Sequence, residues 1–273
     1  MADGYIHSFS AEEQARLVAQ AEFLEPYIFP TIEFPGCARV LEVGCGVGAE
    51  LQILRRRFPQ AKLTGLDYSA AQLAKARELL HADLATGQIE LRQGSAYELP
   101  FDSGEFDGVC LVWVLEHLAR PERALREANR VLRPGGWFSV TEVYNASWET
   151  HPPCPAMADY WRAFNELQRD LGGQPDVGSE LGELAAQADF CEIQFRTLPV
   201  RMDATMEAPA ARRRFINYWQ ALWLSGAAQL RERKRLPHAL VEALQVEFAG
   251  LANNPAGVFH YTACQVSART PSA

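Results

Sequence analysis

Short apolar runs alternate with helical patterns along the first half of the chain. Residues 40–43, 63–66 and 106–114 are mainly apolar, and runs of this length are typical of strands buried in a parallel sheet. The segments between them place apolar residues at helical spacing. Strand and helix alternate five times over residues 37–143, so the pattern predicts a parallel sheet with helices on both faces.

A helical pattern also precedes the first strand. Ser10 followed by Glu13 is typical of a capping box at a helix start. Apolar residues then share one face of a helix that we expect over residues 11–25. Pro26 is expected to end this helix, because proline lacks the N–H that the next turn needs.

The pattern changes in the second half of the chain, where three prolines stand between residues 150 and 155. Gly-Gly-Gln-Pro at 172–175 marks a further break. The later segments predict, in order, a helix over 156–171, a short helix over 180–188, a strand over 192–200, helices over 204–250 and a last strand over 258–268.

Three glycines follow the first apolar run at alternate positions. Gly44, Gly46 and Gly48 stand between the first strand and the next helix. Glycine lets the chain turn tightly there and lets a ligand approach bare backbone N–H groups. Asp67 ends the next strand, about 20 residues further on, where a carboxylate can accept both hydroxyls of a ribose. The alternative for Asp67 is the N-cap of the following helix.

A nicotinamide dinucleotide is a competing ligand, because Gly44, Gly46 and Ala49 also satisfy its glycine fingerprint. Glu42 argues against it. A carboxylate inside the strand would repel a pyrophosphate but would suit a cationic amino-acid ligand. The alternative for Glu42 is a carboxylate paired with a basic neighbour such as Arg39.

Three further segments match one family in the same order. These are residues 94–101, 106–118 and 127–138, and the last contains Arg-Val-Leu-Arg-Pro-Gly-Gly, which has no place in a dinucleotide-binding pattern. With the glycine loop and the Asp67 strand they make five motifs, and through about half its length the chain resembles the class I S-adenosylmethionine-dependent methyltransferases of small-molecule type. The resemblance implies S-adenosyl-L-methionine as cofactor and S-adenosyl-L-homocysteine as product.

The resemblance also implies an α/β fold with a doubly wound, mostly parallel seven-stranded sheet and helices on both faces. In that family the sheet ends in an antiparallel hairpin, here residues 189–200 and 256–269. The segment between them, 201–255, is far too long for a hairpin loop and is expected to form a helical lid before the last strand. The remaining expected units are an N-terminal helical arm over 1–36, a cofactor-binding core over 37–145 and substrate-side helices over 146–188.

The resemblance assigns cofactor roles by motif position. Glu42 would hold the amino group directly or through water, the glycine loop would meet the methionine moiety, and Asp67 would take the ribose hydroxyls. Ser95 stands where the family often has Asp, so a hydroxyl would have to meet the adenine amino group. The expected cofactor-binding residues are Glu42, Gly44, Cys45, Gly46, Gly48, Asp67, Tyr68, Gln72, Ser95, Ala96, Val112 and Trp113.

Methyl transfer from a sulfonium depends mainly on alignment and exclusion of water, so no catalytic triad is required. His117 and His151 are the candidate general bases, with packing or capping roles as the alternative. The N-terminal arm is expected to pack over the cofactor cleft or on the core. The expected substrate-binding residues are Tyr5, His7, Tyr160, Trp161, Trp219 and Trp223, and the aromatic residues of the insert have the core of the lid as their alternative role.

Composition narrows the class of protein. The chain has 273 residues, is 48% hydrophobic and carries a formal net charge of −8, which argues against a sequence-independent nucleic-acid binder. Its histidines and cysteines show no metal-ligand spacing, so no metal is expected. No apolar run approaches a membrane span, and the absence of a charged-then-apolar leader predicts a cytoplasmic protein. Residues 201–235 have a basic excess, interpreted either as a solvated face or as a patch for an anionic acceptor or carrier domain.

The sequence therefore predicts a methyltransferase acting on a small-molecule acceptor by in-line displacement. The alternatives are an RNA or protein methyltransferase, or a non-catalytic protein that binds S-adenosylmethionine as a partner or regulator. The sequence assigns neither the acceptor, nor the methylated atom, nor the oligomeric state.

Overall fold

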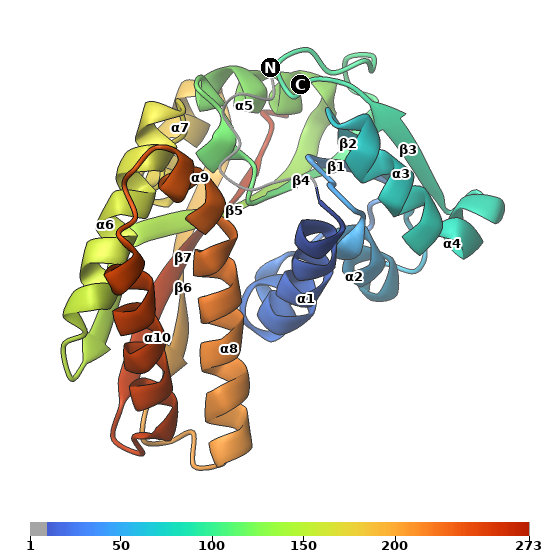
Figure 1. Cartoon of the computed structure of the whole chain (residues 1–273). Helices are drawn as coiled ribbons and strands as arrows, with labels where there is room; N and C mark the ends of the chain where they lie inside the picture. The colour runs from blue at the N-terminus through green and yellow to red at the C-terminus, as the bar shows by residue number, and fades with distance from the viewer. Residues whose placement is uncertain (1–9, 273) are drawn as a thin grey trace.

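A computed structural model describes residues 10–272 of the protein. One seven-stranded sheet forms its centre, with strand order β3-β2-β1-β4-β5-β7-β6 and helices on both faces (Figure 1). The first five strands are parallel, and β7 runs antiparallel between β5 and β6. The predicted α/β fold class is confirmed. The strands are β1 (Arg39–Val43), β2 (Lys62–Asp67), β3 (Ile89–Gln93), β4 (Phe106–Val112), β5 (Leu132–His151), β6 (Cys191–Met202) and β7 (Val258–Arg269).

The helices form a set around the sheet and a set that extends from it. Those around the sheet are α1 (Ala11–Ile28), α2 (Ala49–Arg57), α3 (Ala70–Leu79), α4 (His81–Ala85), α5 (Pro121–Val131) and α7 (Leu181–Gln187), with short 3-10 helices η2 (Phe29–Thr31), η3 (Leu115–His117) and η4 (Val177–Glu180). Those of the extension are α6 (Pro155–Asp170), α8 (Pro209–Ser225), α9 (Ala227–Glu232) and α10 (His238–Asn253), of which the last three lie between β6 and β7 in the chain.

Two buried apolar clusters lie on opposite faces of the sheet. Val40 and Leu41 are neighbours on β1 but belong to different clusters, because successive side chains of a strand point to opposite faces. The larger cluster continues into the extension, where it includes the buried aromatic side chains of α6 and α8. The cofactor half and the extension are therefore joined by continuous apolar packing.

Helix α1 begins as its sequence predicts but ends later. Ser10 is its N-cap and accepts a hydrogen bond from the backbone N–H of Glu13 (3.2 Å). The expectation that Pro26 ends the helix is wrong, since the helix continues to Ile28. Proline removes one hydrogen bond of the last turn, but the N–H of Phe29 still donates to the carbonyl of Glu25, and Ile28 is buried in the core.

Strand β5 is much longer than the other parallel strands. It continues past residue 145, where the sequence places the end of the core, and after a register shift between Tyr144 and Glu149 it pairs with β7 as far as Val258. The ends of β5, β6 and β7 thus project beyond the parallel part of the sheet. Figure 1 shows α6, α8 and α10 packed along this projection.

Two further findings bear on the class of protein. Within residues 10–272 no helix combines the length and the apolar character needed to cross a bilayer. All six cysteines are free thiols, and only Cys191 among them is not buried.

Candidate active site

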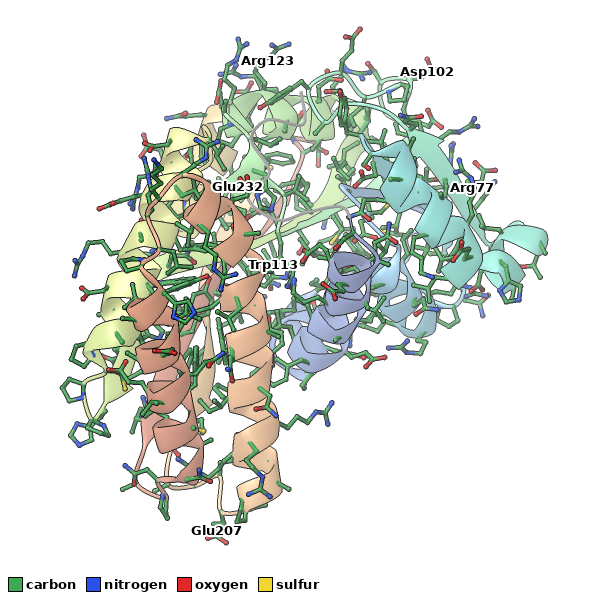
Figure 2. The ribbon with its side chains drawn as sticks, in the orientation of Figure 1. Arg77, Asp102, Trp113, Arg123, Glu207 and Glu232 are labelled. Atoms are coloured by element: carbon green, nitrogen blue, oxygen red, sulfur yellow. The ribbon has the colours of Figure 1, made fainter. Side chains whose placement is uncertain are left out.

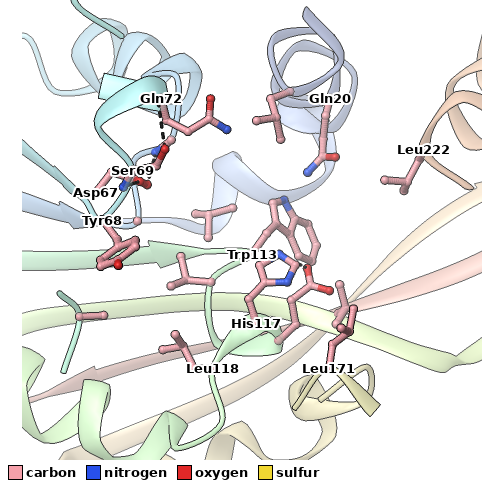
Figure 3. A pocket seen from close by; sticks show the side chains of 18 of the residues that line it. Gln20, Asp67, Tyr68, Ser69, Gln72, Trp113, His117, Leu118, Leu171 and Leu222 are labelled. Carbon is pink, nitrogen blue, oxygen red and sulfur yellow. Dashed lines mark hydrogen bonds and ion pairs between the residues drawn. The ribbon is translucent and has the colours of Figure 1, made fainter. Parts of the chain in front are cut away.

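A cavity of about 860 Å³ opens at the carboxyl ends of the parallel strands. This is the edge at which open α/β sheets bind ligands. The glycine loop, the end of β2 and the segment after β4 line one half, and α1, α6 and α8 contribute to the other. Figure 3 shows Tyr68 and Gln72 on one side of the pocket, with Trp113 and His117 projecting toward its middle.

The three glycines of the loop have different surroundings. At Gly44 (φ +78°) a Cβ would lie 2.5 Å from Cγ2 of Val114, so the loop packs closely on the segment after β4. At Gly48 (φ +80°) it would lie 2.6 Å from Leu80. At Gly46 (φ +50°) it would meet nothing within 4 Å, so open space borders this stretch of backbone. Gly44 and Gly46 line the cavity, whereas Cys45, which is buried in the core, and Gly48 do not.

Asp67 joins the end of β2 to the glycine loop. One carboxylate oxygen accepts from the N–H of Gly46 (2.9 Å), and the other accepts from the N–H of Ser69 (2.7 Å). Ser69 is the N-cap of α3, with its hydroxyl accepting from the N–H of Gln72, so the N-cap alternative for Asp67 is wrong. Burial raises the pKa of Asp67, and the two N–H donors oppose that rise. Each oxygen can still accept a further hydrogen bond.

Glu42 is a buried carboxylate that no cation among residues 10–272 pairs with. It is 2% exposed, and its Oε2 has no hydrogen-bond partner among the described residues. The alternative partner Arg39 instead pairs with Glu105 (2.5 Å). Burial raises the pKa of Glu42, and the charges of Glu50 and Asp67 raise it further.

Glu50, in the first turn of α2, extends this acidic group to the cavity surface. Glu50 lines the cavity, whereas Glu42 does not. Burial raises its pKa to about 7, while its own backbone N–H and the nearby charge of Arg16 lower it. Two carboxylates this close, one of them unpartnered, fit a cationic ligand group such as an ammonium. Open space beside Gly46 provides room for that ligand.

The other residues expected at the adenine end, Tyr68, Gln72, Ser95 and Ala96, also line the cavity. Ser95 has a structural role in addition. Tyr68 is 59% exposed, and Gln72 is buried with its side-chain oxygen accepting from Gln14 of α1 (3.1 Å). The Ser95 hydroxyl accepts from the N–H of Tyr97 (3.1 Å), which fixes the turn after β3. Ala96 lies beside it.

Val112, Trp113 and His117 bring the end of β4 into the cavity. Trp113 has φ +57°, a conformation that is uncommon for a bulky residue, and its N–H donates to the carbonyl of Thr141 (3.0 Å). His117 ends η3, with Nε2 3.8 Å from Oε1 of Glu116. The other candidate base, His151, is exposed at the far end of β5 opposite Val258 and does not line the cavity.

A buried carboxylate holds the turn between Trp113 and His117 in place. Glu142 of β5 is fully buried and accepts from the N–H groups of Val114 (2.8 Å) and Leu115 (2.6 Å). Its second oxygen accepts from the N–H of Glu116 (3.4 Å), whose own carboxylate accepts from Gln168 (2.7 Å). Burial raises the pKa of Glu142 to about 8, helped by the charge of Glu116 and opposed by the three N–H donors.

Glu142 is therefore expected to make the free energy of unfolding decrease as pH rises from about 4.5 to about 8. Glu142 has an ordinary carboxyl pKa of 4.5 when unfolded and about 8 when folded, so the folded state binds the proton more tightly. Between these values the free energy of unfolding decreases with pH, and above about 8 the decrease ends. Denaturant titrations of Glu142→Gln should show a shallower decrease, whereas Glu149→Gln, exposed on the same strand, should match the parent. An unchanged slope in Glu142→Gln would contradict this assignment.

The aromatic residues predicted to bind substrate divide into two groups. Trp161 and Trp219 line the cavity, and each is less than a tenth exposed. Tyr160 and Trp223 are fully buried behind them and do not line it. The Tyr160 hydroxyl donates to the carbonyl of Trp223 (2.5 Å), and the Trp223 ring stacks on Trp161 with centroids 4.4 Å apart. For Trp223 the alternative role, the core of the lid, is the one the structure supports, and Tyr160 of α6 belongs to the same buried cluster.

Tyr5 and His7 lie outside the described residues. Sequence patterns also missed several cavity residues, because polar positions on a helix or loop look the same whether they face solvent or a ligand. The only available signal was their position after strand ends or on the arm. The missed residues include Arg16, Gln20, Glu50, Glu116, Asn145 and Tyr261.

Comparisons with known proteins identify relatives of this chain. Residues 41–140 match the family described as "Methyltransferase domain". The chain is 33% identical over 144 residues to a demethylmenaquinone methyltransferase of Desulfitobacterium hafniense, covering 52% of this chain and 54% of that one. It is 28% identical to the Symbiobacterium thermophilum protein of the same name, covering 72% and 85%. Several of the similar curated proteins are thus matched over only about half of their length.

A solved structure supports the fold over nearly the whole chain. The phosphoethanolamine N-methyltransferase 2 of Haemonchus contortus, in complex with S-adenosyl-L-methionine, superposes with a TM-score of 0.59. The match covers 99% of this chain and 59% of that one at 14% sequence identity. At this identity the likeness concerns the arrangement of strands and helices.

Proposed function

We infer that the chain is a class I S-adenosylmethionine-dependent methyltransferase, and we propose that it uses S-adenosyl-L-methionine to methylate a small-molecule acceptor in the cavity at the strand ends. The observation that carries this proposal is the buried Oε2 of Glu42, which has no hydrogen-bond partner among the described residues, behind a cavity that Glu50 and Gly46 line. When bound, the cofactor supplies a methyl group already activated on a sulfonium.

The residues of the cofactor half would bind and orient it. Glu42 and Glu50 would attract its ammonium group, Glu42 directly or through water. Asp67 would accept the two ribose hydroxyls with the lone pairs that its N–H donors leave available. Tyr68 would lie against the adenine, with Ala96 at its edge. The loop glycines would let the backbone come close to the methionine moiety.

The other half of the cavity would place the acceptor and exclude water. Trp113, Trp161 and Trp219 give it an aromatic wall. Closely packed aromatic walls favour a flat apolar acceptor, and the two relatives named for demethylmenaquinone support that class. His117 would accept a proton from the acceptor where one must leave. Alignment of the reacting atoms in such a dry site accounts for most of the expected rate.

Two alternatives remain distinguishable. A non-catalytic cofactor-binding protein would be favoured by an acceptor side closed off by packed side chains, whereas this cavity runs from Gly46 to Trp161 and Trp219. The net charge of −8 argues against RNA as acceptor.

We also infer a cytoplasmic location, because the six thiols suit a reducing compartment.

Calorimetry on the purified full chain tests the ligand class. S-adenosylmethionine and S-adenosylhomocysteine should each bind in the micromolar range, and NAD should not bind, because the carboxylates of Glu42 and Glu50 would repel its pyrophosphate. Methyl transfer is then followed as S-adenosylhomocysteine release with hydroquinone-type acceptors. Binding of NAD without binding of S-adenosylmethionine would refute the proposal.

Metal removal should leave the protein unaffected. Over the described part of the chain, no three His, Cys, Asp or Glu side chains are grouped as a metal would require. We expect the same S-adenosylhomocysteine affinity and the same turnover before and after dialysis against EDTA. A stoichiometric metal whose loss abolishes turnover would contradict this expectation.

A further inference from the structure

Arginine side chains from two separate segments reach the same cavity. We propose that Arg120 and Arg233 form an anion-binding site at its mouth, so that the acceptor carries a carboxylate or phosphate group on its apolar body. This inference rests on the proposed function and narrows its substrate class. The cavity is otherwise acidic on the cofactor side, where Glu42, Glu50 and Asp67 gather.

The two arginines belong to two segments that each contact the end of α6. Arg120 follows η3, and a Cβ on Gly172, just past α6, would lie 4.0 Å from the Cβ of Ala119. Arg233 follows α9 and is held near α6 by the ion pair of Arg235 with Asp170. Both arginines line the cavity with Asp170, Leu171 and Gly172.

Figure 2 shows where the end of α9 lies in the extension. Glu207 and Glu232 lie at opposite ends of the insert, and Glu232, next to Arg233 in the chain, is at the end nearer α5. Arg213 lies near the start of α8, 20 residues before Arg233 in the chain, and does not line the cavity. The basic excess of residues 201–235 therefore divides into arginines that border the cavity and arginines that do not.

Charge pairing separates Arg120 and Arg233 from Arg16, the third arginine that lines the cavity. The side chains of both are exposed and make no hydrogen bond or ion pair with residues 10–272. Asp170, which lines the cavity with them, is already paired with Arg235, and Arg16 pairs with Glu13. Two uncompensated guanidinium groups at one opening favour a ligand oxyanion, which each can bind through paired N–H donors.

The chemistry of the rest of the cavity defines the acceptor. Trp161, Trp219 and Leu222 offer an apolar aromatic chamber further in. An acceptor that fits both parts has a flat apolar body and a terminal carboxylate or phosphate that stays at the wet mouth. The alternative, that both arginines are simply solvated, predicts no preference between charged and neutral ligands of one shape.

Isosteric probes distinguish these cases. The full chain, saturated with S-adenosylhomocysteine, is titrated calorimetrically with 2-naphthoate, 2-naphthyl phosphate and the neutral 2-naphthamide. The tighter-binding of the two anions should bind about tenfold more tightly than the amide, as two exposed charge pairs would give. Tighter binding of the naphthoate would indicate a carboxylate acceptor, and tighter binding of the naphthyl phosphate would indicate a phosphate acceptor. Added salt should weaken anion binding only.

Matched double variants locate the effect. Arg120→Gln with Arg233→Gln should abolish the preference, whereas Arg213→Gln with Arg214→Gln removes the same charge from α8 and should preserve it. Three outcomes would overturn the proposal: the anions bind no better than the amide, no naphthalene probe binds at all, or the preference survives in the Arg120→Gln, Arg233→Gln variant. Affinity for S-adenosylhomocysteine should be equal in all variants. If the parent failed to bind it, the proposed function would fail, while the same probe titrations without it would still test the arginines.

Discussion

Asp67→Ala is expected to bind S-adenosylhomocysteine about 10- to 150-fold more weakly than the parent. The substitution removes the carboxylate that would accept the ribose hydroxyls and that now accepts from the N–H of Gly46 (2.9 Å). Loss of charge-assisted hydrogen bonds of this kind costs about 1.5–3 kcal/mol. Calorimetric titration of both proteins at one pH measures the difference directly.

A matched control separates this effect from a general loss of charge. Asp102 is exposed on the loop before β4, and Asp102→Ala should bind like the parent (Figure 2). Thermal unfolding of each apo variant shows whether the glycine loop still folds. Normal affinity in a folded Asp67→Ala would mean that Asp67 only fixes the turn before α3, and the assignment of the ribose site would be wrong.

Trp223→Ala is expected to lower the free energy of unfolding by about 3–5 kcal/mol, the usual cost of removing a large buried aromatic side chain. Trp223 is fully buried, stacks on Trp161 and makes edge contacts with Trp148 and Phe248 at centroid distances of 5.1 and 5.5 Å. Urea titration followed by circular dichroism measures the loss, and a separate early transition would show that the extension unfolds before the sheet.

The control for this variant lies on the same insert. Val246 of α10 is 71% exposed, and Val246→Ala should change stability by less than about 0.5 kcal/mol. Below the transition, folded Trp223→Ala should retain parental affinity for S-adenosylhomocysteine, because Trp223 does not line the cavity. A stability loss below about 1 kcal/mol would show that the aromatic cluster is not a cooperative core.

The sequence predicts the cofactor half well because its signals are local. A strand, a glycine loop and an acidic strand end stand within some 25 residues, and parallel pairing of β1 with β2 brings Gly46 and Asp67 together. Periodicity likewise predicts the order of helices and strands. The rule that proline ends a helix fails at Pro26, because burial of Ile28 outweighs one lost backbone hydrogen bond.

The acceptor half is less predictable because it depends on tertiary contacts. Tyr160 and Trp161 are consecutive, and only packing against α8 decides that Trp161 faces the cavity while Tyr160 lies behind it. Glu142 gives no local signal, since its three N–H partners lie 26 to 28 residues away in sequence. Its role emerges only when β5 pairs beside β4.

The insert leaves and rejoins the sheet at directly paired positions, because Met202 at the end of β6 lies opposite Phe259 of β7. Its endpoints therefore stay together whatever the chain between them does, and lengthening such a loop costs little closure entropy. The insert thus behaves as an exchangeable cassette. A replacement helical unit would have to cover Phe259 and Tyr261 and to pack on Phe23 of α1, as α8 does.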